Sequence, residues 1–442
     1  MRSIRVFRLD FLGNSRGLIE VPGLCCPPSG LSEAERGRHR SSSIDCRGSN
    51  MGLSVARKVA ALCVVWLFLS LFSPVAVSAG STSNKWFGAL QIRTGQEATL
   101  RVANLNAVTL ELGWDAFEPS QGVVNKTYVG EQRLRLDKLR RAGFSVFLDL
   151  GLQYPPAWVF KLNGATRLVN QDGVEWRGGT GTNLVNAVFN PAVRAAQSEY
   201  YSLVAAAFPK DSFAAIRVGG LHMGELSYPP PNGKSNTMWM YDQQAQAASP
   251  VPGWRPGRGT RNQARLGLKY YFDSINGYAS WLLSLSSRNF PSADLQLLLP
   301  SWGLRPGQID AALAAELRGT TSAEINGLIT QGLDWTSQVN LLIPYGSRGV
   351  AYTTWLDAES GDQSLQYMSP ADYLYTLTTS RGLALGGENT GGGNQRTLQI
   401  CLDRVTGLRM RGMMWMNADS LISDAALRQT YSSGARAALN AG

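Results

Sequence analysis

The feature that most restricts the fold of this chain is the alternation of strand-like and helix-like segments after residue 80. Eight short segments have strand character, at residues 86–92, 107–112, 145–150, 213–218, 295–299, 349–356, 383–385 and 408–416. The clearest helical patterns between them cover residues 131–142, 267–285 and 370–380. Such alternation is typical of a parallel sheet with crossover helices, and eight units suffice to close a barrel. We therefore predict a single (β/α)8 TIM-barrel domain over residues 80–442.

The residues before position 80 have a different character. Residues 1–50 are irregular, and we expect them to be disordered or to lie upstream of a true start at Met51. Residues 51–79 then combine two basic residues, an apolar run and a small-residue ending at Ala79, which is the pattern of a secretory signal peptide. The apolar run is shorter than the about 20 residues of a membrane span. We predict cleavage after Ala79 and a secreted or extracytoplasmic protein without stable membrane association; the alternative is an uncleaved signal anchor.

Charge argues against a nucleic-acid partner. The whole chain has a formal net charge of +10, but residues 1–79 hold 10 of the 42 basic and 5 of the 32 acidic side chains. Half of the excess positive charge therefore lies outside the predicted barrel. The remainder is too small to predict binding to a polyanion.

The residue inventory also excludes several kinds of chemistry. After residue 79 the chain contains one histidine, His222, and one cysteine, Cys401, which we expect to be a buried residue of a helix. Histidine-rich or cysteine-rich zinc sites are then impossible. After residue 79 the chain also has no GxSxG, GxGxxG or GxxxxGK[ST] motif of the kind that serves a nucleophilic serine or a nucleotide. We predict that the protein needs neither a metal nor a cofactor.

A carboxylate follows directly after the fourth predicted strand. The mostly apolar run 213–218 is followed by Gly219 and Gly220, which permit a sharp turn, and then by Glu225. In a (β/α)8 barrel, a polar residue just beyond the carboxyl end of a strand lies on the catalytic face. The alternative is a loop carboxylate that caps a backbone amide or is only solvated.

The segment around this carboxylate, GLHMGELSYP, resembles the segment of plant and bacterial β-amylases that carries their catalytic acid. The resemblance extends more weakly over most of the chain after residue 85, and family-42 β-galactosidases, which also have a (β/α)8 barrel, share it. It implies that Glu225 is the general acid of a glycoside hydrolase, with Tyr228 near the substrate. The β-galactosidases usually have Asn before the acid, whereas this chain has Gly224.

Cleavage of a glycosidic bond requires a second carboxylate opposite the acid. Both families place it at the end of the seventh strand, where this chain has Glu388 followed by Asn389, in a glycine-rich LALGGEN sequence instead of the LEM of β-amylases. We expect Glu388 to act as a base through a water molecule, with inversion at the anomeric carbon, and Asn389 to contact the substrate. Asp357 and Glu359, after the sixth strand, are the alternative partners.

Aromatic residues at the predicted strand ends are candidates for binding sugar rings, because indoles stack on the apolar faces of pyranoses. The segments ELGWDAFEP and QYPPAWV resemble stretches of both families, which implies substrate roles for Glu111, Trp114 and Trp158. Four further candidates are His222, Trp302, Trp355 and Trp415. For the histidine and each tryptophan, the alternative is a structural residue of the core. We also expect the long connection 230–259, which contains Trp239 and Trp254, to cover the substrate.

The sequence thus predicts a secreted glycoside hydrolase that cleaves O-glycosidic bonds of an oligo- or polysaccharide with the paired carboxylates of Glu225 and Glu388. Two alternatives stay open at this point. One is a barrel that binds saccharide without catalysis, and the other is a membrane-anchored scaffold.

Overall fold

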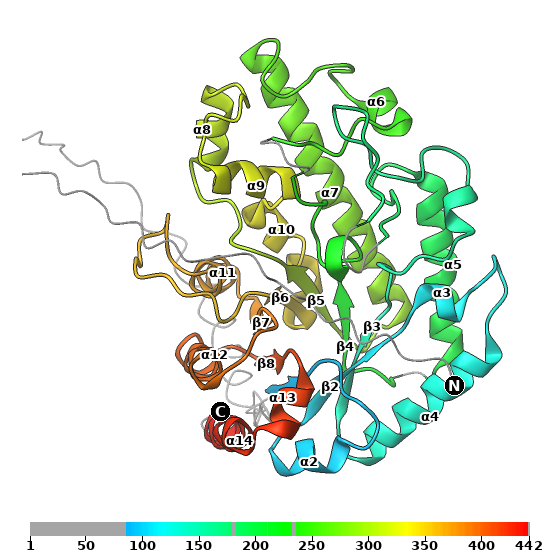
Figure 1. The fold of residues 1–442 in the computed structure, drawn as a ribbon, viewed down its shortest axis with the longest axis vertical. Helices are drawn as coiled ribbons and strands as arrows, with labels where there is room; N and C mark the ends of the chain where they lie inside the picture. The colour runs from blue at the N-terminus through cyan, green and yellow to red at the C-terminus, as the bar shows by residue number, and fades with distance from the viewer. Residues whose placement is uncertain (1–84, 179–182, 210, 232–235, 441–442) are drawn as a thin grey trace, which may run out of the picture. The chain divides into compact units, whose positions relative to one another are not determined.

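The computed structural model describes residues 85–178, 183–209, 211–231 and 236–440 (Figure 1). The predictions for residues 1–79, including the signal peptide, lie outside these ranges. Eight parallel strands form a closed barrel in chain order, and the first strand pairs with the last. The predicted (β/α)8 fold is therefore confirmed. The strands are β1 Trp86–Ala89, β2 Ala107–Glu111, β3 Ser145–Asp149, β4 Ala215–Val218, β5 Asp294–Leu299, β6 Gly349–Thr353, β7 Ala384–Glu388 and β8 Gly412–Trp415.

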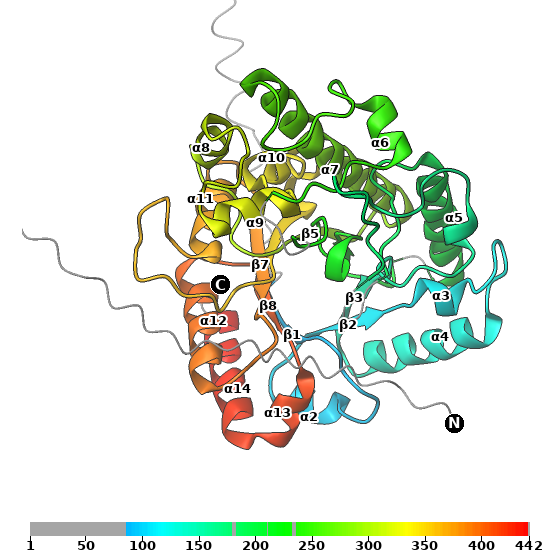
Figure 2. The same cartoon turned by 45° about the horizontal axis from the view of Figure 1, so that its top comes forward.

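Helices surround the strands on the outside of the barrel, as Figure 2 shows. They are α2 Glu97–Val102, α3 Trp114–Phe117, α4 Lys126–Arg141, α5 Pro191–Ala207, α6 Gln243–Ala248, α7 Arg261–Asn289, α8 Gln308–Ala314, α9 Ala323–Gln331, α10 Trp335–Asn340, α11 Pro370–Thr379, α12 Gln395–Gly407, α13 Ala418–Ser423 and α14 Ala425–Asn440. Helix α11 begins at Pro370, as predicted, because proline suits the first helical position. Helix α5 also begins with proline after the capping residue Asn190, a start signal that our sequence analysis missed.

Two hydrophobic clusters hold the fold together. The larger one lies between the barrel and its helices and includes the buried thiol of Cys401, as predicted. The smaller one fills the barrel interior with side chains from seven of the eight strands, among them Trp86, Phe147 and Tyr352. The indole of Trp86 packs edge-on against Phe147 and stacks on Tyr352. The barrel interior is thus a packed core, and only the carboxyl end of the strands is available for a site.

Strand β7 contributes glycine to this interior, which corrects one boundary. The seventh strand was predicted to cover residues 383–385, but β7 continues through Glu388. A Cβ atom on Gly386 would lie 2.7 Å from Cζ2 of Trp86, and one on Gly387 would lie 2.7 Å from Cγ2 of Thr353. The glycines therefore allow β7 to approach its neighbours closely, and Glu388 ends a buried strand.

Candidate active site

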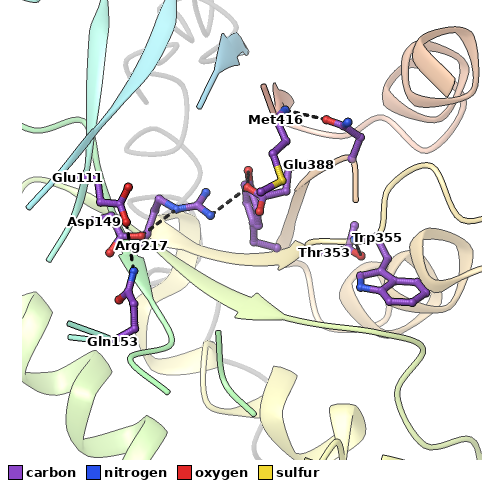
Figure 3. Close-up of polar contacts among 10 residues, drawn as sticks. Glu111, Asp149, Gln153, Arg217, Thr353, Trp355, Glu388 and Met416 are labelled. Carbon is purple, nitrogen blue, oxygen red and sulfur yellow. Dashed lines mark hydrogen bonds and ion pairs between the residues drawn. The ribbon is translucent and has the colours of Figure 1, made fainter. Parts of the chain in front are cut away.

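Four charged residues lie at or near the carboxyl ends of strands β2, β3, β4 and β7. Glu111 pairs in register with Asp149, and Asp149 pairs in register with Arg217. Glu388 ends β7 and reaches the same interior space from the other side (Figure 3). Because residues in register on neighbouring parallel strands point to the same side of the sheet, the barrel brings these side chains together.

Arg217 connects the two sides of this group. Its Nη2 lies 2.9 Å from Oε2 of Glu388, and its Nε lies 3.7 Å from Oδ2 of Asp149. The hydroxyl of Tyr352 donates to the same Oε2 of Glu388 at 2.8 Å. The side chains of Arg217 and Glu388 are only 6% and 8% exposed, so this ion pair lies in a poorly hydrated interior. Paired charges are the form in which ionised groups are tolerated there.

Glu225 follows a tight turn, His222–Gly224, directly above β4. Met223 and Gly224 have positive φ angles of 58° and 80°. Backbone bonds fix the turn, because Leu221 donates to the carbonyl of Glu225 at 3.1 Å. Left-handed residues held in this way often lie at functional sites. The half-buried carboxyl has a pKa raised to about 8 by burial, and the negative charge of Glu388 adds to the effect. Glu225 is therefore protonated at neutral pH.

Glu111 is the second residue at this face whose pKa is raised. Its side chain remains accessible to water, yet protein surrounds it closely enough that the loss of hydration, with the nearby charge of Asp149, raises its pKa to about 7. The amide of Gln153 donates to its Oε1 at 3.3 Å. Burial also raises the pKa of Asp149 above its usual value, against the opposing effect of Arg217. Titratable groups with such shifts cluster at functional sites.

The structure separates the other predicted substrate residues into two groups. Those with some exposed surface are Glu111, Trp158, His222, Trp302 and Trp355. Those that are completely buried are Trp114, Tyr228, Asn389 and Trp415. The buried group has no surface for a sugar ring, so in this structure these residues support the walls of the site.

The polar atoms of the buried group confirm that supporting role. The amide of Asn389 donates to the carbonyl of Gly392 at 3.1 Å and accepts from the N–H of Met416 at 2.7 Å, which joins β7 to the end of β8. The indole of Trp415 donates to Ser420 and that of Trp114 to Glu118, each at 2.9 Å. The polar atoms of Asn389, Trp415 and Trp114 are therefore engaged within the protein itself.

The loop expected to cover the substrate is also largely structural. Residues 230–259 contain helix α6, and the indoles of Trp239 and Trp254 are buried. Trp239 donates to the carbonyl of Pro229 at 2.9 Å, and Trp254 to that of Arg258 at 2.7 Å. Both tryptophans therefore anchor the described part of this loop. Residues 232–235 lie outside the described ranges.

The alternative partners of Glu225 are engaged elsewhere. Glu359 forms an exposed ion pair with Arg396 at 3.0 Å. The carboxylate of Asp357 accepts hydrogen bonds from the backbone N–H and the hydroxyl of Thr390, at 2.8 and 2.9 Å. Glu388 is the carboxylate whose charge acts on Glu225.

Sequence analysis missed Arg217 and Tyr352, which contact Glu388, and Asp149, which pairs with Arg217. A signal was present for Arg217, because an arginine within the apolar run 213–218 must find a charged partner inside the barrel. His222, which sequence analysis did single out, is packed edge-on against Trp176, and burial lowers its pKa to about 4. His222 is therefore neutral near Glu225.

Two further properties concern the described residues as a whole. They contain no group of three or more His, Cys, Asp or Glu side chains placed to hold a metal ion. Within the same ranges, no helix has the length and apolar character required to cross a membrane.

Comparisons with known proteins identify the class of fold. Neither a family model nor a curated protein matches the sequence. Among solved structures, the catalytic domain of the β-amylase from Paenibacillus polymyxa aligns with a TM-score of 0.60 and 14% identity, over 76% of this chain and 92% of that domain. A β-galactosidase from the psychrophilic Marinomonas ef1 aligns with a TM-score of 0.54 and 10% identity, over 79% of this chain and 59% of that enzyme.

A family-42 β-galactosidase from G. stearothermophilus aligns with a TM-score of 0.52 and 12% identity, over 80% of this chain and 56% of that enzyme. The chain therefore has the (β/α)8 barrel fold of these glycoside hydrolases. It spans somewhat more than half the length of the two galactosidases.

Proposed function

We propose that this protein is a glycoside hydrolase that uses Glu225 as general acid and Glu388 as the second carboxylate. The observation that carries the proposal is the contrast between the two groups. Glu225 holds a proton at neutral pH because its pKa is about 8, while Glu388 accepts from Arg217 and Tyr352 as an ionised carboxylate does. A protonated and an ionised carboxyl at one face are what glycosidic cleavage requires.

In the proposed reaction, Glu225 gives its proton to the glycosidic oxygen as the bond to the anomeric carbon breaks. Glu388 removes a proton from a water molecule, whose oxygen forms the new bond to that carbon. The configuration is then inverted, in keeping with Gly224 in place of the asparagine that precedes the acid in β-galactosidases. Inverting enzymes hold their carboxyls about 6.5 to 9.5 Å apart to admit this water.

The substrate in this proposal is an oligo- or polysaccharide, bound at the face that carries Trp355 and the half-buried Trp158 and Trp302. Trp355 is 36% exposed at the end of β6, as a ring that stacks on a pyranose must be. The named neighbours act on different sugars, so we propose a screen that includes α-glucans and β-galactosides. We further propose that the protein is secreted after cleavage following Ala79, which the mass of the mature N-terminus tests.

The deciding experiment compares wild type with Glu225→Gln on two aryl glycosides of whichever sugar the screen identifies. Glutamine keeps the volume but cannot donate a proton, so cleavage of a poor leaving group should slow by at least about two orders of magnitude. A 2,4-dinitrophenyl glycoside, whose leaving group needs no protonation, should be much less affected. Equal rates for wild type and variant on the poor leaving group would contradict the proposal. Proton NMR of the first-formed sugar then tests inversion, because a product with the configuration of the substrate makes Glu388 a nucleophile.

A further inference from the structure

The interior ion pair has a geometry that the two-carboxylate proposal does not by itself explain. Both protein donors to Glu388, the guanidinium of Arg217 and the hydroxyl of Tyr352, contact Oε2. Among the described residues, no donor contacts Oε1. The donors also support each other, since the guanidinium carbon of Arg217 lies 5.0 Å from the centre of the Tyr352 ring. The carboxylate is therefore held by one oxygen while the other is left for a ligand.

We propose that Arg217 is a positioning residue that holds Glu388 in its ionised form and directs Oε1 toward the substrate. This inference rests on the proposed glycoside hydrolysis, in which Oε1 would accept the proton of the attacking water. Arg217 does not touch the reacting atoms; it acts through Glu388. Asp149 anchors Arg217 from the opposite side, 3.7 Å from its Nε.

The charge balance of the site explains why such a residue is needed. Glu388 faces Arg217 on β4, Tyr352 on β6 and Glu225 in the turn after β4. Arg217 also faces Asp149 on β3 and Glu111 on β2. Arg217 thus pairs with the carboxylates of Glu388 and Asp149, and its charge also acts on Glu111 and Glu225.

Without Arg217, an ionised Glu388 would be a buried charge with no cation, and such a group takes up a proton instead. A protonated Glu388 could not accept the proton of the attacking water. The separation into one acid and one base would be lost. Arg217 therefore assigns the two roles, although it lies behind the carboxylate.

The test compares Arg217→Met, which removes the charge but keeps a long side chain, with Arg217→Lys, which keeps the charge. In Arg217→Met we expect kcat to fall about tenfold to a hundredfold with little change in KM, as for a misplaced catalytic group. The acidic limb of the pH–rate profile should move to higher pH, because Glu388 must now lose its proton without help from a cation. Because Arg217→Lys keeps the positive charge, its acidic limb should lie close to that of wild type.

Stability supplies a readout that does not depend on activity. In Arg217→Met, folded Glu388 and Asp149 retain protons that the unfolded chain releases at lower pH, so the loss of stability relative to wild type should grow as pH rises from 5 to 9. Arg411→Met is the matched control, because it breaks the Arg411–Asp294 pair at the other end of the barrel. It should leave the shape of the pH–rate profile unchanged.

The outcomes distinguish this inference from the proposed function. If wild type cleaves no glycoside, the function is wrong, while the pH dependence of stability still tests the hold on Glu388. If Arg217→Met shows the same stability loss at pH 5 and pH 9 and an unshifted acidic limb, the inference is overturned. Should Arg217→Met fail to fold, Tyr352→Phe removes only the second donor to Oε2 and should lower kcat with a smaller shift of the same limb. An unchanged kcat and limb in Tyr352→Phe would equally contradict the inference.

Discussion

The two ends of the barrel interior both contain an arginine paired across the sheet, but their charge balance differs. At the amino end, Arg411 before β8 meets Asp294 at the start of β5 at 2.8 Å, and the charge of Arg348 also acts on this carboxylate. At the carboxyl end, Arg217 faces four carboxyls, two of which have pKa values raised to about 7 and about 8. A carboxylate that is matched by cations in this way fixes strand positions. An excess of carboxyls over cations forces some of them to hold protons, which is what a general acid requires.

The largest difference between the two ends of the barrel should appear in kcat when one carboxylate at each end is replaced by its amide. Glu388→Gln should lower kcat by at least about two orders of magnitude, because the amide cannot accept a proton from water. Asp294→Asn, at the amino end, should leave kcat within about twofold, since it lies behind the packed interior cluster. Steady-state kinetics on the same glycoside checks both. Similar losses of kcat in the two variants would mean that catalysis is not confined to the carboxyl end of the barrel.

The pH dependence of wild type should locate the acid at the carboxyl end. Because Glu225 must be protonated to act and its pKa is about 8, kcat/KM should fall as pH rises through that value. This pKa is above that of a glutamate in the unfolded chain. Its contribution to the free energy of unfolding is therefore present at low pH and is lost as pH rises through about 8.

Glu225→Gln provides the control for the pH-dependent stability. It removes the titrating group, so its stability should depend less on pH between about 5 and 8 than that of wild type. Chemical denaturation at a series of pH values measures this directly. A wild-type stability curve that matches the variant over that range would contradict the raised pKa.

The pair at the amino end should affect stability alone. Arg411→Met leaves the partly buried Asp294 without its partner, so we expect a loss of about 1 to 3 kcal/mol in the free energy of unfolding. Urea denaturation near neutral pH measures this loss, and activity per folded molecule should not change. A drop in kcat as large as that of Arg217→Met would show that the ion pairs are not functionally distinct.

The smallest effect is expected at the rim of the carboxyl end. Trp355→Ala removes an indole that is 36% exposed, and KM should rise severalfold while the free energy of unfolding changes by less than about 0.5 kcal/mol. Trp415→Ala is the contrasting variant, because that indole is completely buried at the end of β8, and it should cost about 3 to 5 kcal/mol of stability. An unchanged KM in Trp355→Ala would remove this residue from the sugar site.

Sequence by itself determined the order of strands and helices and the two glutamates at strand ends. These are local properties, since apolar segments of strand length between helical patterns report the fold, and position after a strand reports the face of the barrel. The same reasoning identified Glu225 from the residues that follow β4. It could not distinguish the buried Trp415 from the exposed Trp355, because burial depends on side chains that are distant in the sequence.

Only the tertiary structure decided which groups share the site and in what state. Arg217 and Glu388 are 171 residues apart, and closure of the barrel brings them within 2.9 Å. The seventh strand was predicted to end before the glycines that precede Glu388, yet they belong to β7, where the indole of Trp86 and the side chain of Thr353 leave no space for a Cβ atom. The pKa of Glu225 likewise arises from burial and from a charge on another strand. Periodicity specifies which face a side chain occupies, but partners across a barrel are set by the packing of the whole chain.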